Sequence, residues 1–315
     1  MIFPGALGDL LLALPALRAL RARHASVTLV VNAWLCALGG LAGVADETVA
    51  LDGAAAAGLF AGDALPPWLA GGPAVFSWLG AGDDALRTRV AAAAGSARIF
   101  RVERGSGLGH AAAAYARAVG ARATPRALAA AAALAPPPSP RAAALLAGLH
   151  GPVLAVHPGA GSRAKRWDVA GFVRVAHWWR AAGGAVVAIV GPAEAGEPPA
   201  LGAPEAREWP LPDLAALLAG AALYLGNDSG VSHLAGAVGA AGVVLFGPTE
   251  PRRWRPLAGR LVPLRARAGG VEGMTLTALP APRVVAACRR RFALTRSTLE
   301  TSVLADQWAP RGGFK

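Results

Sequence analysis

The stretch LYLGNDSGVSH, residues 223–233, contains an apolar strand, a turn of small and polar residues, and the start of a helix. The first backbone N–H groups of such a helix have no partner within the helix, and the positive end of the helix dipole lies at the same point. Anions such as phosphate bind there. Ser229 and Gly230 leave the backbone open to close approach. The stretch therefore predicts a diphosphate site on a parallel sheet.

Asp228 is an unexpected residue in a phosphate site, because its carboxylate would repel the ligand. It either caps the helix or accepts hydrogen bonds from hydroxyl or N–H groups. His233 follows in the opening turn of the same helix, and the next strand ends in another tight turn, FGPT, at residues 246–249. These neighbours favour a functional role for Asp228, with the N-cap as the alternative.

The same order of strand, turn and helix recurs on both sides of this stretch. The first half predicts strands at 2–3 (a short stub), 27–32, 48–51, 74–77 and 97–101, and a helix at 10–23. The second half predicts strands at 153–157, 185–190, 222–225 and 242–246, and helices at 172–182, 214–219, 231–238 and 280–291. This alternation is typical of α/β proteins in which crossover helices connect parallel strands.

The run APPPSP at 135–140 separates the two halves, because repeated proline fixes φ and removes backbone donors. A chain of 315 residues is also about the length of two domains. We expect a Rossmann-like domain at 1–148 and another at 149–278. Residues 279–315 would form a helix and, from Phe292 onward, a loosely held tail.

Composition narrows the class of protein. Hydrophobic residues make up 54% and charged residues 16%, which predicts a globular chain. The net charge of +12 fits an anionic partner (nucleic acid, an acidic membrane or a phosphorylated substrate) or simply a solvated basic surface. Nothing in the sequence resembles a zinc finger, an RRM aromatic pair or a basic zipper. Cys36 and Cys288 are far apart, which favours the reducing cytoplasm. Residues 10–17 lack the basic flank of a signal peptide, and no apolar run is long enough for a spanning helix.

A second candidate site is HPGAGSRAKRW, residues 157–167, where a predicted strand ends in a glycine-rich loop. Its spacing differs from that of a P-loop. Lys165 is distinctive, because the chain uses Arg almost everywhere and its only other Lys is Lys315. A compact ammonium at this point indicates an anion-binding role, and a solvated lysine is the alternative.

Two acidic residues follow predicted strands at the edge where parallel sheets bind ligands. Asp9 lies in the turn after the first strand and is a candidate general base toward a hydroxyl, or else an N-cap. Glu194 follows the strand at 185–190 and is a candidate ligand of ribose hydroxyls, or else an exposed turn residue.

These motifs, in this order, resemble glycosyltransferase family 9, the ADP-heptose:lipopolysaccharide heptosyltransferases. The resemblance covers roughly Ile2 to Cys288. It is most specific at three places: Gly8-Asp9 through Arg18; residues 157–167; and residues 227–233 followed by the turn at 246–249.

The resemblance implies an α/β chain of GT-B fold, with two Rossmann-like domains whose parallel sheets face each other across a cleft. It implies a bacterial enzyme that moves heptose, with inversion, from ADP-L-glycero-β-D-manno-heptose to the Kdo/heptose inner core of lipopolysaccharide. Asp9 would deprotonate the acceptor and Lys165 would neutralise the leaving diphosphate. The expected donor-binding residues are Ser162, Glu194 (ribose), Trp209 (adenine), Asp228 (sugar), Ser229, Gly230 and His233.

The expected partners follow from the same resemblance. The nucleotide sugar is a co-substrate, and no cofactor, metal or nucleic acid is expected. The acceptor would be an anionic lipid A-type molecule at the inner face of the cytoplasmic membrane. The net charge of +12 would attract the chain to such a lipid. We expect a cytoplasmic monomer, peripheral at that membrane. Two alternatives remain: a GT-B transferase or isomerase using another nucleotide sugar, and a non-catalytic nucleotide-sugar-binding homologue.

Overall fold

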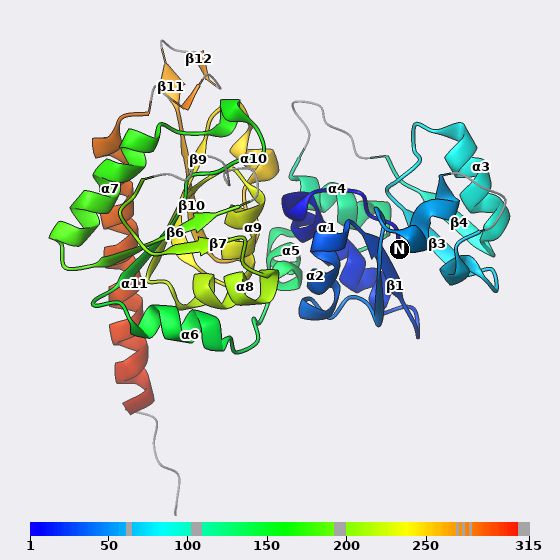
Figure 1. Cartoon of the computed structure of the whole chain (residues 1–315), viewed down its shortest axis with the longest axis horizontal. Helices are drawn as coiled ribbons and strands as arrows, with labels where there is room; N and C mark the ends of the chain where they lie inside the picture. Colours follow the sequence, from blue (N-terminus) through cyan, green and yellow to red (C-terminus); the bar gives the residue numbers. More distant parts are fainter. Residues whose placement is uncertain are drawn as a thin grey trace, which may run out of the picture.

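The computed structural model describes residues 1–60, 65–101, 109–191, 200–268, 271–272, 275–276 and 279–307. It contains two α/β units next to each other along the long axis of the molecule (Figure 1). The predicted α/β class with parallel sheets is confirmed. Within these residues, no helix has the length and apolarity needed to cross a membrane.

The N-terminal sheet is built around a very short central segment. β1 (Thr28–Val31) pairs with β2 (Glu47–Ala50), and β3 (Ala74–Ser77) pairs with β4 (Ser96–Ile99), both in parallel. Ile2 forms a parallel bridge to β1 on one side and to β3 on the other, so it joins the two pairs. The stub predicted at 2–3 therefore holds the centre of this sheet.

Helix α1 (Leu7–Arg21) begins earlier than the sequence predicted. Its N-cap is Ala6, which offers no side-chain cap, and Asp9 lies in the first turn. The alternative that Asp9 caps the helix is therefore wrong. The helix starts as soon as the chain leaves Phe3 and Pro4, because Leu7 and Leu10 are already buried in the core.

The second sheet has six parallel strands in the order β10-β9-β8-β5-β6-β7. The strands predicted from the sequence are β5 (Val153–His157), β6 (Ala185–Val190), β8 (Leu223–Asn227) and β9 (Ala241–Phe246). The edge strands β7 (Glu205–Arg207) and β10 (Arg260–Arg265) were missed, because neither forms a continuous apolar run. Pro263 is tolerated in β10 because an edge strand can lack one backbone donor.

The remaining elements connect and cover the sheets. In the N-terminal unit they are α2 (Cys36–Leu41), α3 (Asp84–Ala93), α4 (Ala111–Ala118), α5 (Pro125–Ala132) and the short 3₁₀ turns η1 (Ala33–Leu35), η2 (Ala54–Leu59) and η3 (Pro67–Leu69). In the C-terminal unit they are α6 (Pro140–Ala147), η4 (Arg163–Lys165), α7 (Val169–Ala181), α8 (Leu211–Gly220), α9 (Gly230–Ala237), α10 (Pro251–Trp254), the pair β11 (Arg267–Ala268) and β12 (Val271–Glu272), and α11 (Ala281–Gln307).

The proline run at 135–140 contains no regular element until Pro140, which agrees with the prediction that it is not the interior of a helix or strand. Pro140 then opens α6 behind the N-cap Ser139, a helix that was not predicted. The end of the chain differs from the prediction. Helix α11 continues to Gln307, past Phe292, where we expected a loosely held tail to begin. The Phe292 ring packs edge-on against Trp179 of α7, with ring centroids 4.8 Å apart, which anchors the helix beyond the predicted end.

One cluster of buried hydrophobic residues contains side chains of both units. Buried side chains of α1 and α4 belong to the same cluster as those of α8 and α9. Helices α1 and α9 pack directly against each other, so the start of α1 is brought to the carboxyl edge of the second sheet. This packing positions the site described next.

Candidate functional site

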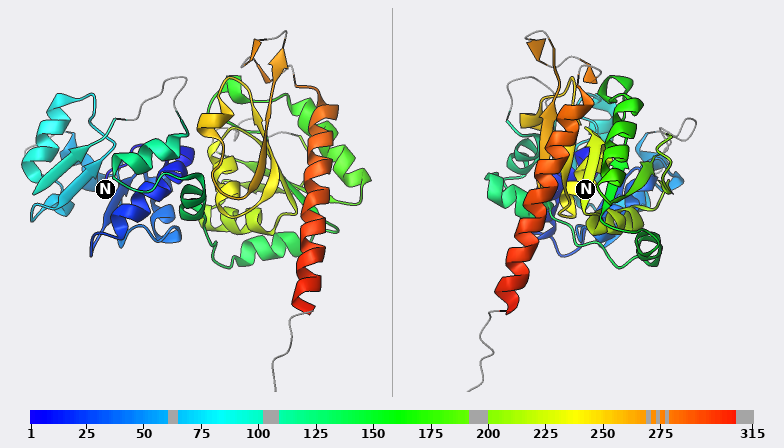
Figure 2. Two further views of the ribbon diagram at one scale, coloured as in Figure 1. Left: turned by 180° about the vertical axis from the view of Figure 1, so that it is seen from behind. Right: turned by 90° about the vertical axis from the view of Figure 1, so that its left-hand side faces the viewer.

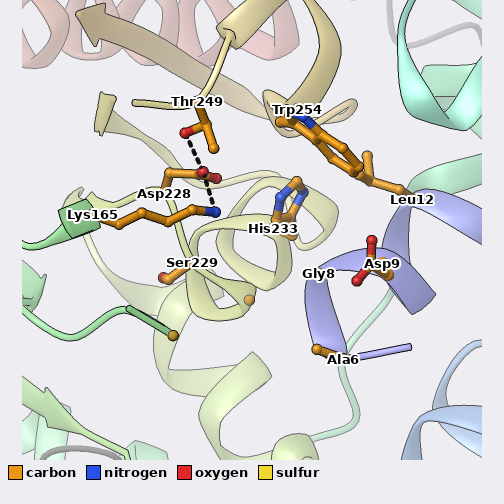
Figure 3. A pocket seen from close by; sticks show the side chains of 12 residues that line it. Ala6, Gly8, Asp9, Leu12, Lys165, Asp228, Ser229, His233, Thr249 and Trp254 are labelled. Atoms are coloured by element: carbon orange, nitrogen blue, oxygen red, sulfur yellow. Dashed lines mark hydrogen bonds and ion pairs between the residues drawn. The ribbon is translucent and has the colours of Figure 1, made fainter. Parts of the chain in front are cut away.

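A pocket of about 320 Å³ lies where the start of α1 meets the start of α9 (Figure 3). Its walls come from both units of the chain. The residues that line it are Ala6, Gly8, Asp9, Leu12, Gly161, Lys165, Asp228, Ser229, Gly230, His233, Thr249 and Trp254. Six of the nine predicted site residues, Asp9, Lys165, Asp228, Ser229, Gly230 and His233, are therefore brought to one pocket.

In the turn after β8, Asp228 and Ser229 make different contacts. Ser229 is the N-cap of α9, and its hydroxyl accepts a hydrogen bond from the Ser232 N–H at 3.4 Å. Asp228 is thus not the cap, and that alternative is wrong. Instead Oδ2 of Asp228 accepts hydrogen bonds from Lys165 Nζ at 2.8 Å and from Thr249 Oγ1 at 2.6 Å. The buried carboxylate is balanced by an ammonium from another loop.

The loop that carries Lys165 is held in place by Asn227, the last residue of β8. The Asn227 side-chain amide donates to the Pro158 carbonyl at 2.6 Å, and its oxygen accepts from the Trp167 N–H at 3.2 Å. His157 adds a contact of 3.1 Å between its Nδ1 and Ser229 Oγ. Both ends of the loop are therefore fixed to the end of β8 and the turn that follows it, and Lys165 reaches the pocket from a defined position.

His233 is a buried imidazole on the pocket wall. It is 7% exposed, and burial lowers its pKa from 6.5 to about 4, against the opposing effect of the Asp228 charge. The ring is therefore neutral at pH 7. Its Cδ2 lies so close to α1 that a Cβ added to Gly8 would come within 2.9 Å of it. A neutral imidazole can donate from one ring nitrogen and accept at the other without adding charge.

Glycine allows the two helix starts to approach each other. A Cβ on Gly230 would lie 2.9 Å from Cβ of Leu7, so a side chain at this position would push α1 and α9 apart. Asp9 lies in the first turn of α1 and faces the pocket from the side opposite Lys165 and Asp228 (Figure 3). The pocket thus combines the positive ends of two helices and an ammonium with a carboxylate across the gap.

Of the predicted site residues that the structure describes, two are not among those lining this pocket. Ser162 is exposed on the Lys165 loop. Trp209 lies between β7 and α8, with the Arg141 guanidinium 4.5 Å from the centre of its ring. Glu194 lies outside the described residues, so its predicted role stays a prediction.

Sequence reasoning missed Leu12, Trp254 and the role of Thr249. Thr249 stands in the predicted tight turn, but its bond to Asp228 joins two loops and has no local signal. Trp254 is on the short helix α10, and its indole lies next to Leu12 of α1 (Figure 3). An aromatic residue on a four-residue helix gives no periodic pattern from which a site could be inferred.

A metal centre was not expected, and that expectation remains a prediction. Within the described part of the chain, no three His, Cys, Asp or Glu side chains are grouped as metal ligands would be.

Residues 124–271 match the family model described as Glycosyltransferase family 9 (heptosyltransferase). The matched stretch includes the Lys165 loop, the turn after β8 and Thr249, whereas Asp9 lies outside it. The match confirms the predicted resemblance and the predicted class of enzyme, a glycosyltransferase. No curated protein matches the chain.

Solved structures of similar fold span nearly the whole chain. E. coli ADP-heptose LPS heptosyltransferase II superposes with a TM-score of 0.71 at 17% identity, over 94% of this chain and 98% of that one. A family 9 glycosyl transferase from Veillonella parvula gives 0.69 at 18% identity, over 93% and 96%. E. coli heptosyltransferase WaaC with ADP gives 0.60 at 17% identity, over 90% and 96%. The predicted GT-B fold is confirmed.

Proposed function

We propose that this chain transfers heptose, with inversion, from ADP-L-glycero-β-D-manno-heptose to the Kdo/heptose inner core of lipopolysaccharide. One observation carries the proposal: Asp9 lines the same pocket as Lys165, Ser229 and Gly230, and faces them from the other unit of the chain. The family match supports the reaction class. The similar fold of WaaC, solved with ADP, supports the choice of nucleotide.

The donor diphosphate binds at the N-terminus of α9 in this proposal. The backbone at Ser229 and Gly230 supplies N–H donors, and Lys165 supplies the positive charge. An ammonium has three donors, so Lys165 can contact a phosphate oxygen while it keeps its bond to Asp228. Asp228 and Thr249 then position the ammonium, and Oδ1 of Asp228 is the atom that would accept from a sugar hydroxyl.

The reaction is a single displacement at the anomeric carbon. Asp9 accepts the proton of the acceptor hydroxyl as that oxygen forms a bond to the carbon. The bond to the diphosphate oxygen breaks at the same time, and ADP leaves with the electron pair. Charge builds up on the leaving phosphate, where the helix N-terminus and Lys165 stabilise it. The neutral His233 adds a hydrogen bond there without repelling the ammonium.

The other predicted contacts complete the proposal. Glu194 binds the ribose and Trp209 packs against adenine, with Ser162 near the donor. The enzyme acts as a cytoplasmic monomer without a metal or other cofactor, on a lipid A-type acceptor at the inner membrane face. The net charge of +12 supports an anionic acceptor.

The test uses the purified full-length chain with ADP-heptose and Kdo-lipid A. We expect release of ADP and a heptosylated lipid, detected by mass spectrometry. Asp9→Asn should lower kcat about 100- to 10,000-fold and leave the affinity for ADP unchanged. The matched control is Asp84→Asn, which also replaces a first-turn acid, on α3, and should have no effect.

Three results would contradict the proposal. If the chain neither bound nor consumed ADP-heptose, that nucleotide sugar would be excluded as the donor. Formation of a free sugar epimer without acceptor would identify an isomerase. Binding of the donor with turnover unchanged by Asp9→Asn would exclude Asp9 as the base.

A further inference from the structure

A second hollow, distinct from the catalytic pocket, lies on the outer side of the C-terminal unit between α7 and α11. Figure 2 shows the two helices side by side on this face. The groove has a volume of about 480 Å³. It is lined by Arg174, Ala281, Pro282, Val285, Ala286, Arg289 and Arg290. We call these residues the α7–α11 groove.

The groove is strongly basic. Arg174, Arg289 and Arg290 are all exposed, and no carboxylate is among the lining residues. Within the described part of the chain, none of these arginines forms an ion pair or a hydrogen bond; Arg289 lies over the Trp178 ring, 5.8 Å from its centre. Guanidinium groups without a hydrogen-bond or ion-pair partner are suited to phosphate, which they bind through paired N–H donors.

The floor of the groove is apolar. Between the arginines lie Ala281, Pro282, Val285 and Ala286, all from the first turns of α11. On the same face of α11, four residues after Arg290, Leu294 is 60% exposed. Basic groups around an apolar surface are typical of proteins that lie on anionic lipid, where the charges meet headgroups and the apolar side chains enter the interface.

We propose that the α7–α11 groove docks the chain onto a bilayer containing anionic phospholipid. Its arginines bind the headgroup phosphates, and the floor contacts the acyl boundary. Nucleic acid fits less well, because the groove lining has no aromatic side chain for bases to stack on. The inference deepens the proposed function, which places the acceptor in a membrane, but it does not depend on catalysis.

The experiment measures partition of the full-length chain onto vesicles that contain no acceptor. Vesicles of phosphatidylglycerol and phosphatidylcholine are compared with vesicles of phosphatidylcholine alone, at fixed ionic strength. Arg174→Gln/Arg289→Gln/Arg290→Gln should lower binding to the anionic vesicles by at least about tenfold. The single substitution Ala286→Glu, which places an acid in the groove, should also lower binding to the anionic vesicles.

The matched control is Arg117→Gln/Arg122→Gln/Arg126→Gln, three exposed arginines of the N-terminal unit. Both triple variants change the net charge from +12 to +9, since each removes three positive charges. The control should bind anionic vesicles within about threefold of the parent chain. Circular dichroism and thermal melts confirm that each variant folds.

Several results would overturn the docking proposal. Equal losses in the two triple variants would show that net charge alone attracts the chain. Equal binding to both kinds of vesicle would exclude anionic headgroups. If the groove variant Arg174→Gln/Arg289→Gln/Arg290→Gln lost binding to a single-stranded RNA oligonucleotide but still bound the vesicles, the groove would be assigned to nucleic acid. Since the vesicles hold no acceptor, these results are independent of whether heptose transfer is observed.

Discussion

The ammonium of Lys165 lies 2.8 Å from Oδ2 of Asp228 in the pocket. Asp228 is nearly buried, with 6% of its side chain exposed, whereas 32% of the Lys165 side chain is exposed. The carboxylate therefore depends on its partners for compensation, and the ammonium can still reach a ligand. This pair links the glycine-rich loop at 157–167 to the turn after β8.

Replacement of Lys165 should separate its proposed role in catalysis from its structural contact with Asp228. Lys165→Met should lower kcat about 100- to 1,000-fold, because the leaving diphosphate loses its positive charge. It should also lower stability, because Asp228 keeps its charge while its ammonium partner is gone. Steady-state kinetics and urea unfolding measure the two effects.

The control for Lys165→Met is Arg163→Met, an exposed cation on the same loop that does not line the pocket. Arg163→Met should leave kcat and the free energy of unfolding unchanged. Adding Asp228→Asn to Lys165→Met should restore stability but not the rate. Recovery of the rate in that double variant would show that Lys165 only neutralises Asp228.

His233 predicts a pH dependence of stability. Its pKa is about 4 in the folded chain and 6.5 as a free side chain, so the unfolded chain takes up the proton first as pH falls. The neutral imidazole makes its full contribution to the free energy of unfolding above pH 6.5. That contribution is lost as pH falls from 6.5 to about 4. From pH 7 to pH 5 the contribution to the free energy of unfolding should fall by about 2 kcal/mol.

Urea unfolding at both pH values compares the parent chain with His233→Gln, which cannot titrate. The parent should lose about 2 kcal/mol more than the variant over this interval. As a control, His177→Gln removes an exposed imidazole of α7 and should follow the parent curve. Identical pH dependence in the parent and His233→Gln would contradict the buried neutral state.

Trp254 is expected to form a surface for the acceptor, because it lies on the α1 side of the pocket, near Asp9 (Figure 3). Trp254→Ala should raise the acceptor KM about three- to tenfold, and Trp254→Phe should retain most of the contact. The dissociation constant for ADP, measured by calorimetry, should not change. Trp68→Ala, at a half-buried tryptophan of the N-terminal unit, is the control. An effect on ADP binding alone would place Trp254 in the donor site instead.

Gly230 tests the close packing of the two helix starts. Gly230→Ala would place a Cβ 2.9 Å from the Cβ of Leu7, which cannot rotate away, so the free energy of unfolding should fall by about 1–3 kcal/mol. Gly40→Ala is the control, because it adds a methyl group within a helix where no atom lies within 4 Å. It should be neutral or stabilising. If Gly230→Ala were equally neutral, α1 and α9 would be free to adjust.

The local pattern of the chain predicted most of the second sheet. The strands at 153–157 and 185–190 were placed at their observed bounds, because strands buried on both faces are continuous apolar runs. The edge strand β10 was not predicted, because it is only partly buried and its short apolar stretch is interrupted by Pro263 and flanked by Arg260 and Arg265. The continuation of α11 past Phe292 was also missed, because the contact of Phe292 with Trp179 is distant in sequence.

The sequence by itself determined the α/β class and the order of strand, turn and helix around 226–230, and it singled out Lys165 and Asp9 as functional candidates. These follow from local properties of the sequence: the apolar patterns of strands and helices, glycines in the turns, and a lysine in a chain whose other basic residues are almost all arginine. Only the tertiary structure decided which groups meet. It assigned the helix cap to Ser229 rather than Asp228, paired Asp228 with Lys165 and Thr249, and brought Trp254 to α1. Such pairings depend on how α1 packs against α9 and how loops converge at one edge of a sheet, and no short stretch of sequence contains that information.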